Sequence, residues 1–226
     1  MSLLYSPHPF TKASKHLAVK ELAANVESDR DYYVLLIGAI LLATGAIFTD
    51  SIPVLIASMI VAPLAYPILG LGLGITARDK RLIFRSAFLL VVSCAIALTI
   101  ASAITLFFGT DRVTNTFISF TGNRDVAIVV AVVAGMIAAY GTVRPRVASA
   151  ITGVAIAVSL MPPLVDTGVA YVSGNHTQAF AAGTLFLLNV AGILVAAILV
   201  FAWFGMGKIY RTRDRSESDL PLPQIS

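Results

Sequence analysis

The sequence predicts an all-α, polytopic membrane protein with six transmembrane segments, and three observations support this class. First, 58% of the 226 residues are hydrophobic and only 12% are charged, whereas a soluble domain carries about 25% charged residues. Second, the apolar residues form six runs, and a helix needs roughly 20 such residues to cross a bilayer. Third, the basic residues gather in alternate connections between these runs, as expected for a chain that crosses a membrane repeatedly.

The six apolar segments form a predicted membrane domain over residues 32–204. The fourth segment is short for a hydrocarbon core of about 30 Å, so it would stand upright or end within protein. The others are long enough to cross, some with tilt. The segments cover residues 32–49, 53–75, 83–108, 126–141, 147–173 and 179–204.

Two more polar regions flank this domain. Residues 1–31 come first, and within them residues 11–28 could form a short helix on the membrane surface. Residues 205–226 form a polar tail, which we expect to be disordered from Arg211 onward. The side chains of the surface helix that would face the lipid are Val19, Leu22 and Val26.

The positions of Lys and Arg predict the orientation of the chain. With the N-terminus in the cytoplasm, 14 of the 16 basic residues lie on the cytoplasmic side. Only Arg112 and Arg124 then lie outside. Because cytoplasmic loops carry an excess of Lys and Arg, we expect a multi-pass protein of the cell membrane with both termini in the cytoplasm.

Two prolines interrupt the second segment and two the fifth, each pair near the middle. Proline cannot donate the helical hydrogen bond to the carbonyl four residues back, and its ring clashes with that carbonyl. Since hydrocarbon offers no water to replace the lost donors, the breaks should be buried in protein or line a wet cavity. The prolines are Pro63, Pro67, Pro162 and Pro163, and the carbonyls that lose their donors are those of Met59, Pro63, Val158 and Ser159.

The order of segments suggests an internal repeat. Arg30-Asp31 opens the first segment and Arg124-Asp125 opens the fourth, and each is followed by a plain, a proline-broken and a plain segment. Each unit (residues 32–108 and 126–204) holds an odd number of spans, so the second should be inverted relative to the first. The alternative is two kinked helices without common ancestry.

Four stretches of the chain carry a family resemblance. They are DSIPVLIASMIVAPLAYPILGLGLGI, ARDKRLIFRSA, SAITGVAIAVSLMPPLVDTGVA and LLNVAGILVAA. They closely resemble the uncharacterised "hydrophobic domain" membrane proteins of prokaryotes, the family known as domain of unknown function 389, over positions 31 to 204. The resemblance implies a multi-spanning prokaryotic membrane protein and brings no established substrate or mechanism. Many relatives carry a further soluble N-terminal domain, where this sequence has about thirty residues.

Asp166 is the strongest single candidate for a functional residue. A carboxylate inside a membrane segment costs about 2.5–3.5 kcal/mol on insertion scales and points to function by default, so Asp166 could bind a cation or carry a proton. Alternatively, it could lie in water at the outer end of the segment, or cap a half-helix that starts at Thr167.

Two other kinds of polar residue accompany it. Asn189 lies within the apolar sixth segment, where it would hydrogen-bond a neighbouring helix or contact the freed carbonyls of the fifth segment. The hydroxyls of Ser58 and Ser159 could hydrogen-bond the backbone groups freed at the two breaks.

Small residues at four-residue intervals, Ala131, Gly135 and Ala139, should form a stripe on which another helix packs.

Paired broken helices near the bilayer centre are typical of the binding sites of transporters. We therefore expect transport of a small ion or solute, with cations favoured because carbonyls and a carboxylate are the available ligands. The alternative is a membrane scaffold or sensor with an apolar interior and no permeation path. The expected site residues are Asp166, Ser159, Val158, Met59, Pro63, Ser58 and Asn189, and the expected partners are membrane lipids, the transported species and further copies of the chain.

Other classes receive no support from the sequence. The three histidines lie outside the segments and far apart, so no metal centre is expected. No motif of a zinc protease or serine hydrolase occurs within the segments, so we expect neither an enzyme nor a cofactor. The net charge of +4 follows the predicted membrane sides and does not indicate nucleic-acid binding.

Overall fold

The computed structural model describes residues 12–26, 29–110, 124–143 and 151–218. These residues form helices and contain no strand, which confirms the all-α class. Each of the six predicted apolar segments contains helix. The helices are α1 (Lys12–Asn25), α2 (Arg30–Thr49), α3 (Ile52–Val61), α4 (Ala65–Ala77), α5 (Lys80–Phe108), α6 (Arg124–Val143), α8 (Ile151–Val172), α9 (His176–Trp203) and α10 (Met206–Ser218).

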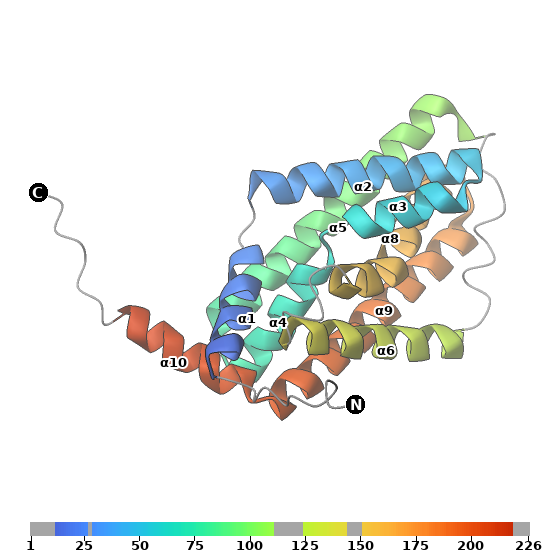
Figure 1. Ribbon diagram of the computed structural model, residues 1–226. Coiled ribbons are helices and arrows are strands. Elements are labelled where there is room, and N and C mark those ends of the chain that lie inside the picture. The colour runs from blue at the N-terminus through green and yellow to red at the C-terminus, as the bar shows by residue number, and fades with distance from the viewer. Residues whose placement is uncertain (1–11, 27–28, 111–123, 144–150, 219–226) are drawn as a thin grey trace, which may run out of the picture.

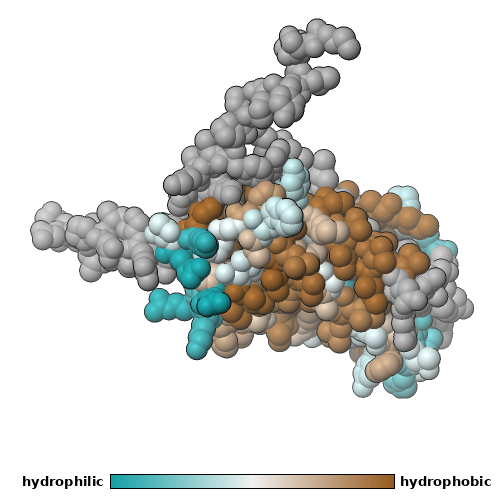
Figure 2. All heavy atoms as spheres, turned by 90° about the horizontal axis from the view of Figure 1, so that it is seen from below, coloured by the Kyte–Doolittle hydropathy of each residue, from teal (hydrophilic) through white to brown (hydrophobic). Residues whose placement is uncertain are grey.

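Several helices have the length and composition of membrane spans. Among the described residues, α2, α5 and α9 are long and apolar enough to cross a bilayer, and the bent pair α3–α4 would be a fourth span. The described part of α6 includes a shorter apolar helix, Ile128–Val143. Figure 2 shows hydrophobic side chains over the middle of one face and hydrophilic side chains toward its ends, which is the surface expected of a protein set in a bilayer.

Helix α8 is the central element of the bundle. It packs against α9, α5, α6, α3 and α2, and these helices lie around it in Figure 1. Its described side chains are buried almost without interruption from Leu160 to Ala170. From Leu160 to Ala170, side chains on every face of α8 therefore contact protein.

The predicted stripe of small residues lies where α6 crosses α9. Ala131 and Ala139 are fully buried, and a Cβ added at Gly135 would lie 2.7 Å from the Cα of Ile193. Two backbones this close leave no room for a side chain. The packing role predicted for these residues is therefore confirmed.

Helices α1 and α10 lie together at one end of the bundle, beside the C-terminal part of α4 (Figure 1). The apolar side chains of this region were predicted to face lipid, and this is wrong: Val19 and Leu22 on α1, and Val26 just after it, are buried in the protein core. The tail is not wholly irregular either, because residues up to Ser218 continue α10, anchored by the fully buried Met206. The sequence shows only an apolar stripe on α1, and such a stripe is the same whether protein or lipid covers it.

The two proline pairs differ in their effect. The second segment is broken as predicted, because α3 ends at Val61, α4 begins at Ala65, and the two axes differ by 43°. The predicted break in the fifth segment is wrong. Helix α8 runs from Ile151 to Val172 with Pro162 and Pro163 inside it.

Candidate functional site

The break between α3 and α4 is built around Pro63. The preceding residue, Ala62, is extended (φ −64°, ψ 123°), as expected because the proline ring disfavours helical backbone before it. The Ala62 N–H still donates to the Ser58 carbonyl (3.1 Å), and the Tyr66 N–H donates to the Pro63 carbonyl (3.3 Å). The expectation that the Pro63 carbonyl lacks a donor is therefore wrong.

The residues that precede this break are buried. Met59 is 4% exposed and Ser58 is fully buried. The Ser58 hydroxyl donates to the Leu55 carbonyl (2.6 Å), one turn before the break. Pro63 cannot supply a donor to the Met59 carbonyl. Pro67 is the third residue of α4, where a backbone N–H would have no partner within the helix in any case.

The second proline pair lies inside an intact helix. Pro162 and Pro163 are both buried, and the Thr167 hydroxyl donates to the Pro163 carbonyl (2.7 Å). The carbonyls opposite the missing donors belong to Val158 and Ser159. The backbone of these two residues is helical, and their side chains lie outside the described part of the chain.

Asp166 lies on α8 one turn beyond the prolines and is only 8% exposed. Its Oδ2 accepts a hydrogen bond from the Gln178 side-chain amide, with 2.7 Å between Nε2 and Oδ2. The idea that Asp166 caps a second half-helix is wrong, because α8 continues to Val172. Asp166 is therefore an interior residue of the central helix, and its carboxylate faces α9.

Gln178 is the member of this pair that sequence reasoning missed. It lies in the first turn of α9, and its backbone N–H donates to the side chain of the N-cap residue Asn175 (3.1 Å). Asp166 lies six residues before the end of α8, and Gln178 lies two residues after the start of α9. The short turn between α8 and α9 brings the start of α9 beside the last turns of α8, so the polar side chains at the start of the sixth segment were the place to look for a partner.

The surroundings of Asp166 compensate its charge only in part. The start of α9 contributes a partial positive charge, and the Gln178 amide contributes a neutral donor. Within the described ranges, no lysine, arginine or histidine forms an ion pair with Asp166. A bound cation or a proton would supply the missing positive charge.

Not all predicted site residues come together here. Asn189 is buried on α9, 4% exposed, but it is eleven residues beyond Gln178. At 1.5 Å per residue this is about 16 Å along the helix. Its predicted contact with the carbonyls of Val158 and Ser159 stays a prediction. No group of three or more metal-ligating side chains occurs among the residues that the structure describes.

The apolar helices of membrane-crossing length and the buried carboxylate on the central helix define a class: helical proteins with the build of integral membrane proteins. More specifically, the chain belongs to the family described as Domain of unknown function (DUF389), whose model matches residues 59–195. The resemblance read from the sequence motifs is thereby confirmed.

One curated relative extends this similarity over most of the chain. The chain is 32% identical over 206 residues to Uncharacterized protein MJ0678 of Methanocaldococcus jannaschii. The alignment covers 88% of this chain and 63% of the relative, so the chain spans somewhat less than two thirds of that protein. No solved structure matches the chain.

Proposed function

We propose that this protein carries a small ion or solute across a membrane, and that Asp166 binds the passing species, most favourably a cation. The supporting observation is the burial of a carboxylate, 8% exposed, with one hydrogen bond from a neutral amide. An unpaired carboxylate in hydrocarbon is costly, and a cation in transit would offset that cost. Backbone carbonyls near the prolines, which carry partial negative charge, would complete the set of ligands.

The proposed topology has six spans with both termini in the cytoplasm. The arrangement of the basic segments supports it: α1, α10 and the junction of α4 and α5 lie at the same end of the bundle (Figure 1). Exposed basic residues occur in all three places, including Lys20, Arg78 and Lys208. Positive charge on one side of a membrane is typical of the cytoplasmic side.

The two groups α2–α5 and α6–α9 would be the inverted repeats, each with three spans. Within each group the helices pack against one another, as repeats of a transporter do. A homo-oligomer is part of the proposal, because six spans cover a buried carboxylate and a helix break only in part.

The test is a flux measurement on purified protein in proteoliposomes, with entrapped fluorescent indicators for Na⁺, K⁺ and H⁺. Asp166→Asn keeps the shape of the side chain and an oxygen that accepts from Gln178, but removes the charge. We expect the cation flux to fall about tenfold or more, since a factor of ten corresponds to about 1.4 kcal/mol of lost binding.

Asp79→Asn is the matched control. Asp79 is the N-cap of α5, where its side chain accepts from the backbone of Arg81 and Leu82, and asparagine caps helices equally well. This variant should retain the flux of the unmodified protein. Equal flux in the Asp166→Asn variant would remove Asp166 from the mechanism.

A second candidate function is a membrane scaffold or sensor without a permeation path. One observation favours it: the residues of the α3–α4 break and the neighbouring part of α8 are apolar and buried, among them Leu64, Leu160 and Met161. In that case the unmodified protein would show no flux above empty liposomes for any of the three cations.

A further inference from the structure

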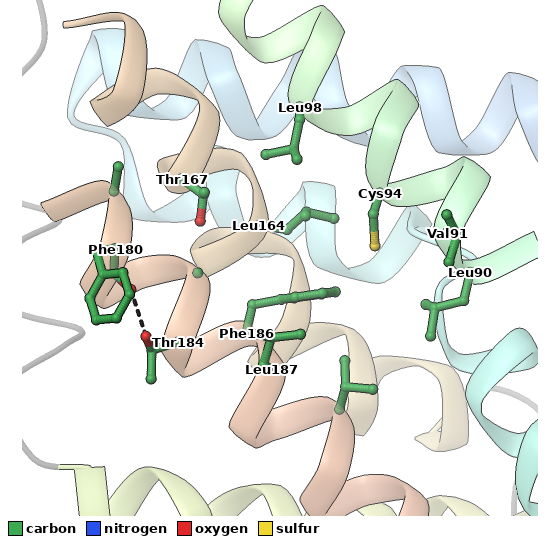
Figure 3. A pocket seen from close by; sticks show the side chains of 13 residues that line it. Leu90, Val91, Cys94, Leu98, Leu164, Thr167, Phe180, Thr184, Phe186 and Leu187 are labelled. Carbon is green, nitrogen blue, oxygen red and sulfur yellow. Dashed lines mark hydrogen bonds between the residues drawn. The ribbon is translucent and has the colours of Figure 1, made fainter. Parts of the chain in front are cut away.

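We propose that a groove between α5, α8 and α9 binds one hydrocarbon chain of a membrane lipid. The groove has a volume of about 540 Å³, and Figure 3 shows its walls: Cys94 and Leu98 from α5, Leu164 from α8, and Phe180 and Leu187 from α9. This inference does not depend on the proposed role of Asp166. It requires only that α5 and α9 lie in a bilayer.

The chemistry of the lining selects hydrocarbon. Apart from the Cys94 thiol, the polar side chains in the groove are Thr167 and Thr184. The Thr167 hydroxyl donates to the Pro163 carbonyl and the Thr184 hydroxyl to the Phe180 carbonyl, at 2.7 Å each. Figure 3 shows the second of these bonds. A polar solute would therefore lose its water without gaining a donor from these hydroxyls, whereas an alkyl chain loses nothing.

The length of the groove selects a lipid chain over a helix of another protein. Along α9 the groove extends from Ala179, near the helix start, to Val190, near its middle. Eleven residues at 1.5 Å each give about 16 Å, close to half of a hydrocarbon core of about 30 Å. The groove thus has the depth of a single leaflet and the length of one lipid chain, while a partner helix that spans the membrane alongside α9 would extend about twice as far.

The walls of the groove are exposed at the rim and buried at the floor. Phe180 and Leu187 on α9 are 75% and 65% exposed, and Val91 on α5 is 66% exposed, whereas Leu164 and Phe186 are 3% and 7% exposed. A lipid chain bound against the buried side chains of the groove would have protein on both sides. Lipids around a smooth helix face lack such flanking walls, so a chain in the groove should exchange more slowly.

Gly183→Leu tests the proposal by filling the groove. Gly183 is part of the lining, and a Cβ there would first meet Thr167 at 3.6 Å, an ordinary contact, so the larger side chain extends into the open space. Gly38→Leu on α2 is the matched control, because nothing lies within 4 Å of a Cβ at that position. It adds the same side chain elsewhere on the bundle.

The first measurement is native mass spectrometry of the full chain purified in mild detergent. We expect the unmodified protein and the Gly38→Leu variant to retain one lipid per chain, and the Gly183→Leu variant to retain about tenfold less. This corresponds to losing the burial of roughly two methylene groups. Equal retention in all three proteins would overturn the proposal, as would no retention in the unmodified protein.

The second measurement uses Cys94, the single cysteine of the chain, and does not depend on how well the variant folds. Delipidated, unmodified protein is treated with N-ethylmaleimide before and after addition of dioleoyl phosphatidylglycerol. We expect the added lipid to slow alkylation about tenfold. An unchanged alkylation rate would show that the lipid binds only elsewhere on the protein surface, and it would overturn the proposal. A dimer linked through Cys94 on mild oxidation would also overturn it, in favour of a second copy of the chain.

Discussion

The helix pair α3–α4 and the helix α8 each contain two prolines, but the prolines affect the two helices differently. The first bends by 43° at Pro63, while the second passes through Pro162 and Pro163 without interruption. Both regions lose two backbone donors, and both are apolar. A proline pair therefore removes two backbone donors, but it does not by itself predict a bend.

The spacing of the prolines explains part of the difference. Pro63 and Pro67 are four residues apart, so in a continuous helix both missing hydrogen bonds would fall on one side and across two successive turns. Adjacent prolines remove two neighbouring bonds within one turn, and the other bonds of that turn still hold the helix together. The α3–α4 segment is thus weakened along one side, which favours a hinge.

Packing explains the rest. Met161, which precedes Pro162, is disfavoured in helical backbone but is fully buried among the helices around α8. On α3 the outer face is open, with Ile56 47% exposed and Ile60 56% exposed. Tertiary contacts therefore hold α8 in a conformation that its local sequence disfavours, whereas α3 has fewer such contacts.

The largest expected effect comes from removing that packing. Met161→Ala should lower the free energy of unfolding by about 2–5 kcal/mol, as expected for a fully buried large side chain. Ile60→Ala on the exposed face of α3 should change it by no more than about 0.5 kcal/mol. Equilibrium unfolding in detergent measures both. Similar losses in the two variants would show that packing does not distinguish α8 from α3.

Replacing the prolines of α8 should act in the opposite direction. The double variant Pro162→Ala/Pro163→Ala restores two donors in a helix that is already formed, and a proline inside a helix costs about 3 kcal/mol. After the loss of ring packing, we expect the free energy of unfolding to rise by about 1–3 kcal/mol in the same assay. If the prolines serve transport, flux should fall while stability rises. A marked loss of stability would instead show that the rings are essential to the core.

Much of the fold could be predicted from the sequence because hydrophobic runs determine which segments become long helices. Each predicted segment contains helix, and basic residues of separate segments meet at one end of the bundle. The covering of α1 could not be predicted, since an apolar stripe looks the same whether it faces lipid or protein. Nor could α10, a polar helix whose buried contact, Met206, depends on tertiary packing.

The candidate site was predictable in its central residue only. Asp166 stands out as an acid within an apolar segment, and the structure buries it. Its partner Gln178 belongs to another helix and becomes a neighbour only through the α8–α9 turn. The carbonyl of Pro63 was misjudged for a local reason: Pro67 has no N–H to donate to it, but the bend brings the Tyr66 N–H into reach.

A smaller effect than in α8 is expected when the proline at the break is replaced in the same way. Pro63→Ala supplies an N–H that could reach the Met59 carbonyl, a gain of about 0.5–1.5 kcal/mol, but it also frees the unfolded chain, a loss of about 0.4–1 kcal/mol. Because the two terms nearly cancel, we expect the free energy of unfolding to stay within about 1 kcal/mol of the unmodified value. A gain as large as that of the α8 double variant would mean that the proline alone maintains the bend, and that α3–α4 would otherwise form one continuous helix like α8.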